Sequence, residues 1–240
     1  MKFILFIEGH AEKTVLPDFL GRWLNPKLNR RVGFTPVRFD GCGDYLSGFA
    51  KKAVIRLNGP SRDEIIAVVG LLDLYGLPGN FYPSHLTDAE NRYEWAKQEL
   101  QNRVGNEKFL QFFAVHELEA WLLSNPELFP REVKNAFPGS AANPESVNFN
   151  QPPGKLLDKL FREKLKRNYK KTVDGHDLFA NLDPEVAYQK CPHLREMLDE
   201  MLKLARDAET DHADTQHSTR RTSSSRSAAR RPKDRPRPGR

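Results

Sequence analysis

The sequence Ile-Ile-Ala-Val-Val-Gly-Leu-Leu-Asp at residues 65–73 decides the fold. An apolar run of this length that ends in an acid is typical of a buried strand in a parallel sheet, because helices cover both faces of such a sheet. Two other stretches have the same form. Residues 3–7 are apolar and lead into Glu8, and residues 112–115 are apolar and come just before Glu117. The three stretches therefore predict parallel strands that each end near an acidic residue.

These acids predict a functional site at one edge of the sheet. In open α/β sheets, ligands bind outside the carboxyl ends of the strands, so Glu8, Asp73 and the acids after residue 115 would meet there. Carboxylates that lie near one another repel, and a cation that joins them relieves the repulsion. Oxygen ligands suit Mg²⁺ or Mn²⁺. We therefore expect a metal-dependent phosphoryl-transfer site.

The basic character of the chain lies in its C-terminal segment. The 240 residues carry a net charge of +6, the pI is about 9.3 and the mean hydropathy is −0.66. Residues 212–240 hold nine Lys or Arg and two Asp, a net charge of +7, so residues 1–211 carry −1. The tail is rich in Ser, Arg and Pro, which predicts disorder over residues 211–240. It either contacts nucleic acid or an acidic partner nonspecifically, or is a solvated extension without a specific role.

Cysteine usage and the lack of a long apolar run bound the class of protein. Cys42 and Cys191 have no metal-ligand spacing and form no disulfide framework, which indicates a reducing compartment. No stretch reaches the length of a membrane span, and no signal-peptide pattern is visible. We expect a soluble cytoplasmic protein with no membrane partner.

The spacing of apolar residues predicts alternating strands and helices. Strands are expected at residues 2–7, 32–39, 65–72 and 109–115, and helices at residues 11–24, 45–57, 87–104, 117–123, 155–166 and 184–207. Crossovers of this length imply parallel strands with right-handed connections. The predicted fold is α/β, with a central, mostly parallel sheet of about four strands flanked by helices. Residues 1–125 would form this core and residues 126–210 an irregular segment with a C-terminal helical cap, followed by the tail.

The acids at the first and third strand ends differ in how far they favour function. Glu8 can serve as a metal ligand or a general base. Glu12 can be a second ligand, or a first-turn acid that the helix dipole favours. An acid at the end of a buried strand is not needed for folding, so a functional role is the better interpretation of Asp73. Tyr75 either lines the site or packs the loop.

Glu117 and Glu119 lie in the sequence His-Glu-Leu-Glu-Ala-Trp, which starts at His116. On a strand end the two acids would face the same side, and on a helix they would not. One can ligate a metal while the other takes a structural hydrogen bond. The spacing is not that of zinc proteases, and the histidine can simply be buried or form a cap. Lys155 and Lys171 can offset charge on a phosphate or be solvated surface charges.

Six motifs together resemble a bacterial Toprim-like family of unknown function, which is related to overcoming-lysogenization-defect nucleases. In order and spacing they cover about residues 1–205. The motifs are Phe6-Ile7-Glu8-Gly9 with Glu12, Asp73-Leu74-Tyr75-Gly76-Leu77-Pro78, His116-Glu117-Leu118-Glu119-Ala120-Trp121-Leu122, Pro153-Gly154-Lys155, Tyr169-Lys170-Lys171 with Asp174-Gly175, and Cys191-Pro192-His193-Leu194. Each motif alone is unspecific, and the set is fairly specific.

The resemblance implies a Rossmann-like Toprim core. In such cores a glutamate after the first strand and an Asp-x-Asp after the third hold Mg²⁺. By similarity, Glu8 takes the glutamate position and Asp73 that of the first aspartate, whereas Tyr75 stands where the second aspartate is expected. The three remaining acids look like the further acids that nucleases of this superfamily recruit. Members of the family are often encoded beside SMC- or ABC-like ATPases, and the pairs look like anti-phage defence systems.

The main hypothesis is a nuclease that depends on Mg²⁺ or Mn²⁺ and cleaves DNA or RNA such as tRNA. It would act as the effector of an ATPase-linked anti-phage system. Homo-oligomerisation is left open. The metal ligands would be Glu8, Glu12, Asp73, Glu117 and Glu119. Lys155 or Lys171 would offset charge on the phosphate. The alternative is a catalytically inactive Toprim-like module that binds and regulates a partner ATPase. A phosphotransferase or nucleotidyltransferase on a small substrate is a third option, although the sequence has no Gly-rich nucleotide loop.

Overall fold

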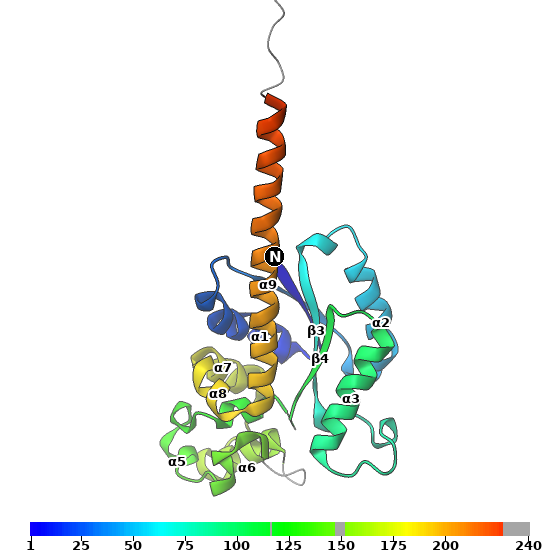
Figure 1. The fold of residues 1–240 in the computed structure, drawn as a ribbon. Coiled ribbons are helices and arrows are strands. Elements are labelled where there is room, and N and C mark those ends of the chain that lie inside the picture. The colour runs from blue at the N-terminus through cyan, green and yellow to red at the C-terminus, as the bar shows by residue number, and fades with distance from the viewer. Residues whose placement is uncertain (116, 147–151, 228–240) are drawn as a thin grey trace, which may run out of the picture.

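Four parallel strands form the centre of the molecule (Figure 1). The structure is a computed structural model that describes residues 1–115, 117–146 and 152–227. The strands are β1 (Lys2–Ile7), β2 (Gly33–Arg38), β3 (Ile65–Asp73) and β4 (Phe109–Ala114), in the order β2-β1-β3-β4. The predicted α/β class with a four-stranded sheet is confirmed, and each strand lies within about one residue of its predicted bounds.

The register of the sheet brings the carboxyl ends of the strands to one edge. Ile7 of β1 pairs with Leu71 of β3, and Asp73 at the end of β3 pairs with Ala114 of β4. All three pairings between the strands are parallel. The chain segments that follow β1, β3 and β4 therefore start from neighbouring positions at this edge.

Helices cover both faces of the sheet (Figure 1). The first four are α1 (His10–Leu24), α2 (Gly41–Leu57), α3 (Ala89–Val104) and α4 (Glu119–Leu123). On one face, α2 and α3 pack against Ile4 and Phe6 of β1. On the other face, α1 and the C-terminal helices pack against Phe3, Leu5 and Ile7. Alternate residues of one strand thus enter two cores, which explains why the strands are apolar throughout.

Gly70 of β3 makes room for a buried hydrogen bond. A side chain at this position would collide with the hydroxyl of Tyr45 and with the side-chain oxygen of Gln111. Tyr45 Oη donates a hydrogen bond to Gln111 Oε1 (2.5 Å), and Gln111 Nε2 donates to Phe112 O (2.8 Å). Burial raises the pKa of Tyr45 well above its ordinary value, so the hydroxyl remains a donor. The polar groups between α2 and β4 are therefore satisfied within the core.

β2 is an edge strand that pairs with β1 alone. Gly33 N donates to Met1 O (3.2 Å), and Phe39 N donates to Ile7 O (2.9 Å). Because successive amides of a strand point to opposite sides, the odd-numbered amides of β2 face β1. Pro36 lies at an even position and has no N–H, so it removes no hydrogen bond from the sheet.

Several helices begin at residues other than those predicted, and α2 and α3 show the reasons. α2 begins at Gly41 and not at residue 45, because Gly41 adopts a φ of +87° that turns the chain into the helix directly after β2. α3 begins at Ala89, and its N-cap is Asp88 in place of the predicted Thr87. The Asp88 carboxylate accepts a hydrogen bond from a backbone N–H of the first turn (2.8 Å), and aspartate is the stronger of the two capping residues.

The C-terminal part of the chain is a set of helices. They are α5 (Arg131–Lys134), α6 (Pro153–Leu165), α7 (His176–Asn181), α8 (Pro184–Lys190) and α9 (Pro192–Ser227), with α5 and α7 not predicted. The single helix predicted from residue 184 is divided between α8 and α9, because Pro192 has no N–H and restrains the residue before it. The carboxylate of Glu145 accepts hydrogen bonds from His193 N (2.8 Å) and Leu194 N (3.2 Å), which satisfies amides in the first turn of α9.

α9 packs on the sheet with its first half and extends beyond the rest of the molecule with its second (Figure 1). The sequence predicted disorder from residue 211, whereas the helical backbone continues to Ser227. A helix that is already nucleated by packing can propagate one residue at a time, which apolar periodicity does not reveal. Residues 228–240 of the predicted tail lie outside the described residues. Among the helices that the structure describes, none is long and apolar enough to cross a membrane.

Candidate active site

Glu8 occupies the turn between β1 and α1 and faces the start of α2. Its Oε1 accepts a hydrogen bond from Cys42 N (3.1 Å), one of the amides at the N-terminus of α2. Burial raises the pKa of Glu8 above its ordinary value, although the hydrogen bond from Cys42 lowers it. The carboxylate is thus fixed by one oxygen, and the sharp turn at Gly41 places the amide that fixes it.

Asp73 ends β3 and lies close to the other carboxylates. Burial raises the pKa of Asp73 well above its ordinary value, and Glu119 raises it further, whereas the ammonium group of Lys171 lowers it. No hydrogen bond or ion pair joins the Asp73 carboxyl to another residue within the described ranges. The charged form of Asp73 is therefore disfavoured by burial, and no described residue forms a hydrogen bond or ion pair with the carboxylate to offset this cost.

Lys171 joins the two acids that follow β4. Its Nζ lies 3.1 Å from Glu119 Oε2 and 3.4 Å from Glu117 Oε1. Glu119 is only 5% exposed, and burial raises its pKa while Lys171 lowers it. Burial lowers the pKa of Lys171, but the three surrounding acids outweigh this effect and the pKa is raised. Glu117 precedes α4 and Glu119 begins it, yet the two acids share one cation.

The Pro-Gly-Lys motif enters the site through its glycine. Gly154 N donates a hydrogen bond of 2.7 Å to Glu117 Oε2. A methyl group at position 154 would lie 2.8 Å from that oxygen and 3.3 Å from Lys171 Cε, so only glycine allows the start of α6 to approach this closely. Lys155 points elsewhere: it is exposed on α6, and among the described residues no hydrogen bond or ion pair joins it to the carboxylates. The sequence singled out Lys155, whereas Gly154 makes the contact.

Glu12 lies in the first turn of α1 and folds back over Gly9. Its Oε2 is buried and has no hydrogen-bond partner among the described residues. An acceptor without a partner is costly to bury, and a cation would satisfy it. The buried oxygen without a partner therefore favours a metal-ligand role for Glu12, because an interaction with the helix dipole does not explain it. His116 lies outside the described residues.

The donors suit a hard divalent cation, since all of them are carboxylate oxygens. Besides burial, the negative charges of Glu119, Glu12 and Glu117 raise the pKa of Asp73. As the side chains are arranged, however, no three His, Cys, Asp or Glu residues of the described ranges converge on a single metal position. Lys171 supplies the positive charge between Glu117 and Glu119.

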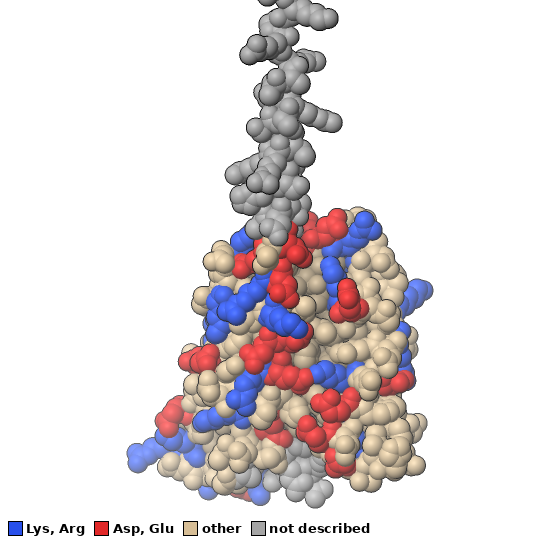
Figure 2. Space-filling model, in the orientation of Figure 1, with Lys and Arg blue, Asp and Glu red and all other residues tan. Residues whose placement is uncertain are grey.

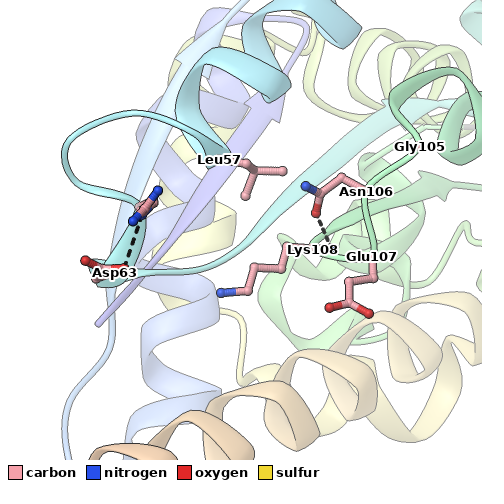
Figure 3. Close-up of a pocket in the computed structure, with 7 residues that line it drawn as sticks. Leu57, Asp63, Gly105, Asn106, Glu107 and Lys108 are labelled. Carbon is pink, nitrogen blue, oxygen red and sulfur yellow. Dashed lines mark hydrogen bonds and ion pairs between the residues drawn. The ribbon is translucent and has the colours of Figure 1, made fainter.

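A shallow hollow of about 590 Å³ lies at the opposite edge of the sheet, where residues before β3 and β4 meet (Figure 3). It is lined by Leu57, Arg62, Asp63, Gly105, Asn106, Glu107 and Lys108. Ligands of open α/β sheets bind at the carboxyl ends of the strands, so this hollow is not the candidate site. On the face that α9 crosses, acidic and basic side chains are intermixed and form no wide basic area (Figure 2).

The sequence matches the family described as Domain of unknown function (DUF4276) over residues 7–202. The chain belongs to the DUF4276 family. The match spans all five acids of the candidate site and both lysines. Curated proteins give no match to this DUF4276 chain.

Two solved structures are similar to the DUF4276 chain. One is the C-terminal region of the OLD protein of Xanthomonas campestris pv. campestris, with 19% sequence identity, a TM-score of 0.41, and coverage of 88% of this chain and 97% of that one. The other is the C-terminal region of the OLD protein of Burkholderia pseudomallei, with 21% identity, a TM-score of 0.44, and coverage of 86% and 97%. At these values the similarity carries no argument about activity, which depends on the residues of the site.

Sequence reasoning missed three features of this DUF4276 site. The amide of Cys42 and the approach of Gly154 are backbone interactions, which residue types alone do not reveal. The Gly-Cys-Gly sequence after β2 and the Pro-Pro-Gly sequence at the start of α6 were the available signals, because glycine marks places where the backbone approaches another group. The third feature is a small pocket beside Asp73, described below.

Proposed function

We propose that this protein is a metal-dependent nuclease of the Toprim type that hydrolyses phosphodiester bonds in DNA or RNA. The observation that carries the proposal is that Glu8 and Asp73 both approach Gly76 at the carboxyl edge of the sheet, and that Lys171 joins Glu117 and Glu119. The sequence resemblance to Toprim domains supports it, since Glu8 and Asp73 match the acids that hold Mg²⁺ there. The domain would act as the effector of an ATPase-linked anti-phage system.

Glu8, Glu12 and Asp73 would hold Mg²⁺ or Mn²⁺, with Glu117 and Glu119 completing the site. When bound, such an ion would supply Lewis-acid polarisation of the phosphate and would make a water more acidic at neutral pH. Glu8 is oriented through one oxygen by the Cys42 amide, which leaves Oε2 for the ion.

Lys171 would serve two purposes in this reaction. Its ammonium group offsets the charges of Glu117 and Glu119 in the resting protein. The side chain is 48% exposed, so its Nζ is accessible to a phosphate that enters the site. There it would stabilise the negative charge that develops on the phosphate oxygens.

The test is cleavage of labelled DNA and tRNA by Glu8→Gln and Asp73→Asn variants, with Mg²⁺, with Mn²⁺ and with a chelator. We expect each variant to lose at least about 100-fold in rate, since each change removes a charged ligand. Glu94→Gln, on the exposed side of α3, is the matched control and should keep full activity. Far-ultraviolet circular dichroism should be the same for all four proteins. Wild-type rates in both site variants would refute the assignment.

The second candidate function is a catalytically inactive Toprim-like module that binds and regulates a partner ATPase of the SMC or ABC type. Tyr75 in place of an expected aspartate favours it, as does the lack of a ready three-residue metal position in the described part of the chain. Thermal unfolding with and without Mn²⁺ separates the two candidates. A rise in the unfolding temperature that Glu8→Gln abolishes supports the nuclease, whereas no metal effect together with tight ATPase binding supports the regulatory module.

A further inference from the structure

A small pocket lies directly beside the carboxylate cluster, on the loop that follows β3. It has a volume of about 210 Å³ and is lined by Leu74, Tyr75, Leu77, Gly79, Tyr82 and Arg92. Gly76 of this loop lies near both acids: a methyl group on Gly76 would lie 3.6 Å from Glu8 Oε2 and 3.9 Å from Asp73 Cβ. A group bound in this pocket would therefore neighbour a phosphate held at the carboxylates.

The chemistry of the lining combines ring faces, apolar side chains and two polar groups. Leu74 and Leu77 are 3% and 6% exposed and form an apolar surface, whereas Tyr75 is 44% exposed. The guanidinium carbon of Arg92 lies 5.0 Å from the centre of the Tyr82 ring. Arg92 Nε donates to Leu86 O (2.9 Å), which holds the side chain in place and leaves its terminal nitrogens for another acceptor.

Tyr82 provides the observation that points to a ligand. Its side chain is 8% exposed, and its hydroxyl is buried with no hydrogen-bond partner among the described residues. Burial raises the pKa of Tyr82 to about 12, Arg92 lowers it and the Cys42 thiol raises it. Tyr82 belongs to the hydrophobic cluster against which Cys42 packs, and the Cys42 amide holds Glu8. A buried hydroxyl without a partner is costly, and a polar ligand edge would satisfy it.

We propose that this pocket binds one unpaired nucleobase of a single-stranded nucleic acid, which stacks on Tyr75 and forms hydrogen bonds with Arg92 and the Tyr82 hydroxyl. The inference rests on the proposed nuclease function, because it assigns the substrate class of the same site. The volume is below the roughly 300–1,000 Å³ of sites for drug-sized ligands, so the pocket accepts a single ring system. Among the described residues that line the pocket, Arg92 alone is a cation, which favours a base over a phosphate group. A paired base has its faces covered by its neighbours, so the base must be unpaired.

The experiment measures binding of a short fluorescent single-stranded oligonucleotide by anisotropy, with the full chain and a chelator present. Tyr75→Ala should weaken binding about 5- to 150-fold, the range that corresponds to the loss of one stacked base. Tyr75→Phe keeps the ring and should bind as the wild type does. Gly79→Leu adds a bulky side chain to the lining and should weaken binding, and it is sterically tolerated because nothing lies within 4 Å of a methyl group placed there. Arg62→Ala, at the opposite edge of the sheet, is the control for a lost surface residue.

Three results would overturn the proposal. They are equal affinities of Tyr75→Ala and Arg62→Ala, the absence of oligonucleotide binding by the wild type, and equal binding of the matching duplex. A parallel titration with adenosine monophosphate distinguishes a base within an oligonucleotide from a free nucleotide. The proposal is also wrong if Tyr75→Ala weakens the binding of adenosine monophosphate alone. The assay contains no divalent metal and requires no cleavage, so it is independent of the nuclease test. Inactive protein with Tyr75-dependent binding would remove the nuclease function and keep the pocket assignment.

Discussion

Lys171 determines whether the acids at the carboxyl edge of the sheet remain ionised. Glu119 is almost fully buried, and a charged carboxylate in such a place needs an opposite charge nearby. Lys155 lies in an equally prominent sequence motif, yet it projects into solvent from α6. The two lysines differ in role because of the path of the chain after α6, which returns residue 171 to the site. Residue type alone could not distinguish them.

We predict that Lys171→Met lowers the free energy of unfolding by about 1–3 kcal/mol at neutral pH. The loss of one partner from a buried pair costs about 3–5 kcal/mol, and the half-exposed lysine reduces that figure. Urea unfolding measures the change, with Lys155→Met as the control that should have no effect. Adding Glu119→Gln to Lys171→Met should restore part of the loss, because it removes the uncompensated charge. A stability of Lys171→Met equal to that of the control would contradict the prediction.

At the scale of single elements, the π-helical turn Lys171–Gly175 carries Lys171 and is itself held by an ion pair. Arg167 donates from both terminal nitrogens to Asp174, each at 2.8 Å, and Lys170 N donates to Asp174 Oδ2 at 2.8 Å. The Arg167 hydrogen bonds lower the pKa of Asp174 below its ordinary value of 3.8, against a smaller opposing effect of burial. The turn that positions the site lysine therefore depends on an ionised aspartate.

This ion pair predicts a pH dependence of stability. A carboxyl with a lowered pKa in the folded state stabilises the fold above its unfolded-state pKa, and the contribution is lost as the pH falls through the folded-state value. Stability of the wild type should thus fall from about pH 4 downward more steeply than that of Asp174→Asn. Urea unfolding from neutral to acidic pH gives both curves. Asp177→Asn, on the exposed start of α7, is the control, and parallel curves for wild type and Asp174→Asn would refute the argument.

The strands could be predicted from the sequence because each is a continuous apolar run bounded by polar residues. The helix boundaries were harder, since they depend on backbone conformation and long-range capping. Gly41 starts α2 early through a positive φ, and Glu145 caps α9 by accepting from His193 N, 48 residues further along the chain. The acids at the strand ends could be named in advance because parallel topology brings them together. Two other features could not be predicted: the contact of Gly154 with Glu117 and the pocket at Tyr82. Both depend on the three-dimensional path of loops that are distant in the sequence.

At the scale of the whole molecule, the predicted core and the C-terminal helices share one hydrophobic cluster. Phe19 of α1 stacks on Trp121 with ring centres 5.7 Å apart and meets Phe179 of α7 edge-on at 6.0 Å. Trp23 stacks on Tyr188 of α8 at 5.1 Å. These contacts join elements that are more than a hundred residues apart, so the position of Lys171 is coupled to the packing of the entire second half of the chain.

We predict that removal of residues 212–240 leaves the midpoint of urea unfolding unchanged. The last fully buried residue of α9 is Ala205, and Glu209 still accepts the hydrogen bond from Arg30 N (2.5 Å) in the shortened chain. The removed segment carries a net charge of +7, so any nucleic-acid affinity should become less sensitive to salt. Anisotropy titrations at several salt concentrations give the slope. An unchanged slope would show that the tail does not contact phosphates.

The proline in β2 also affects how copies of this protein meet. An edge strand exposes a row of unpaired backbone groups that can pair with a strand of another molecule, which is a common start of aggregation. The outward row of β2 lacks its central donor, because the ring nitrogen of Pro36 carries no hydrogen. A strand added at this edge would lose a hydrogen bond at the middle of the new pairing. Pro36 therefore favours a dispersed protein at high concentration without weakening the sheet that contains it.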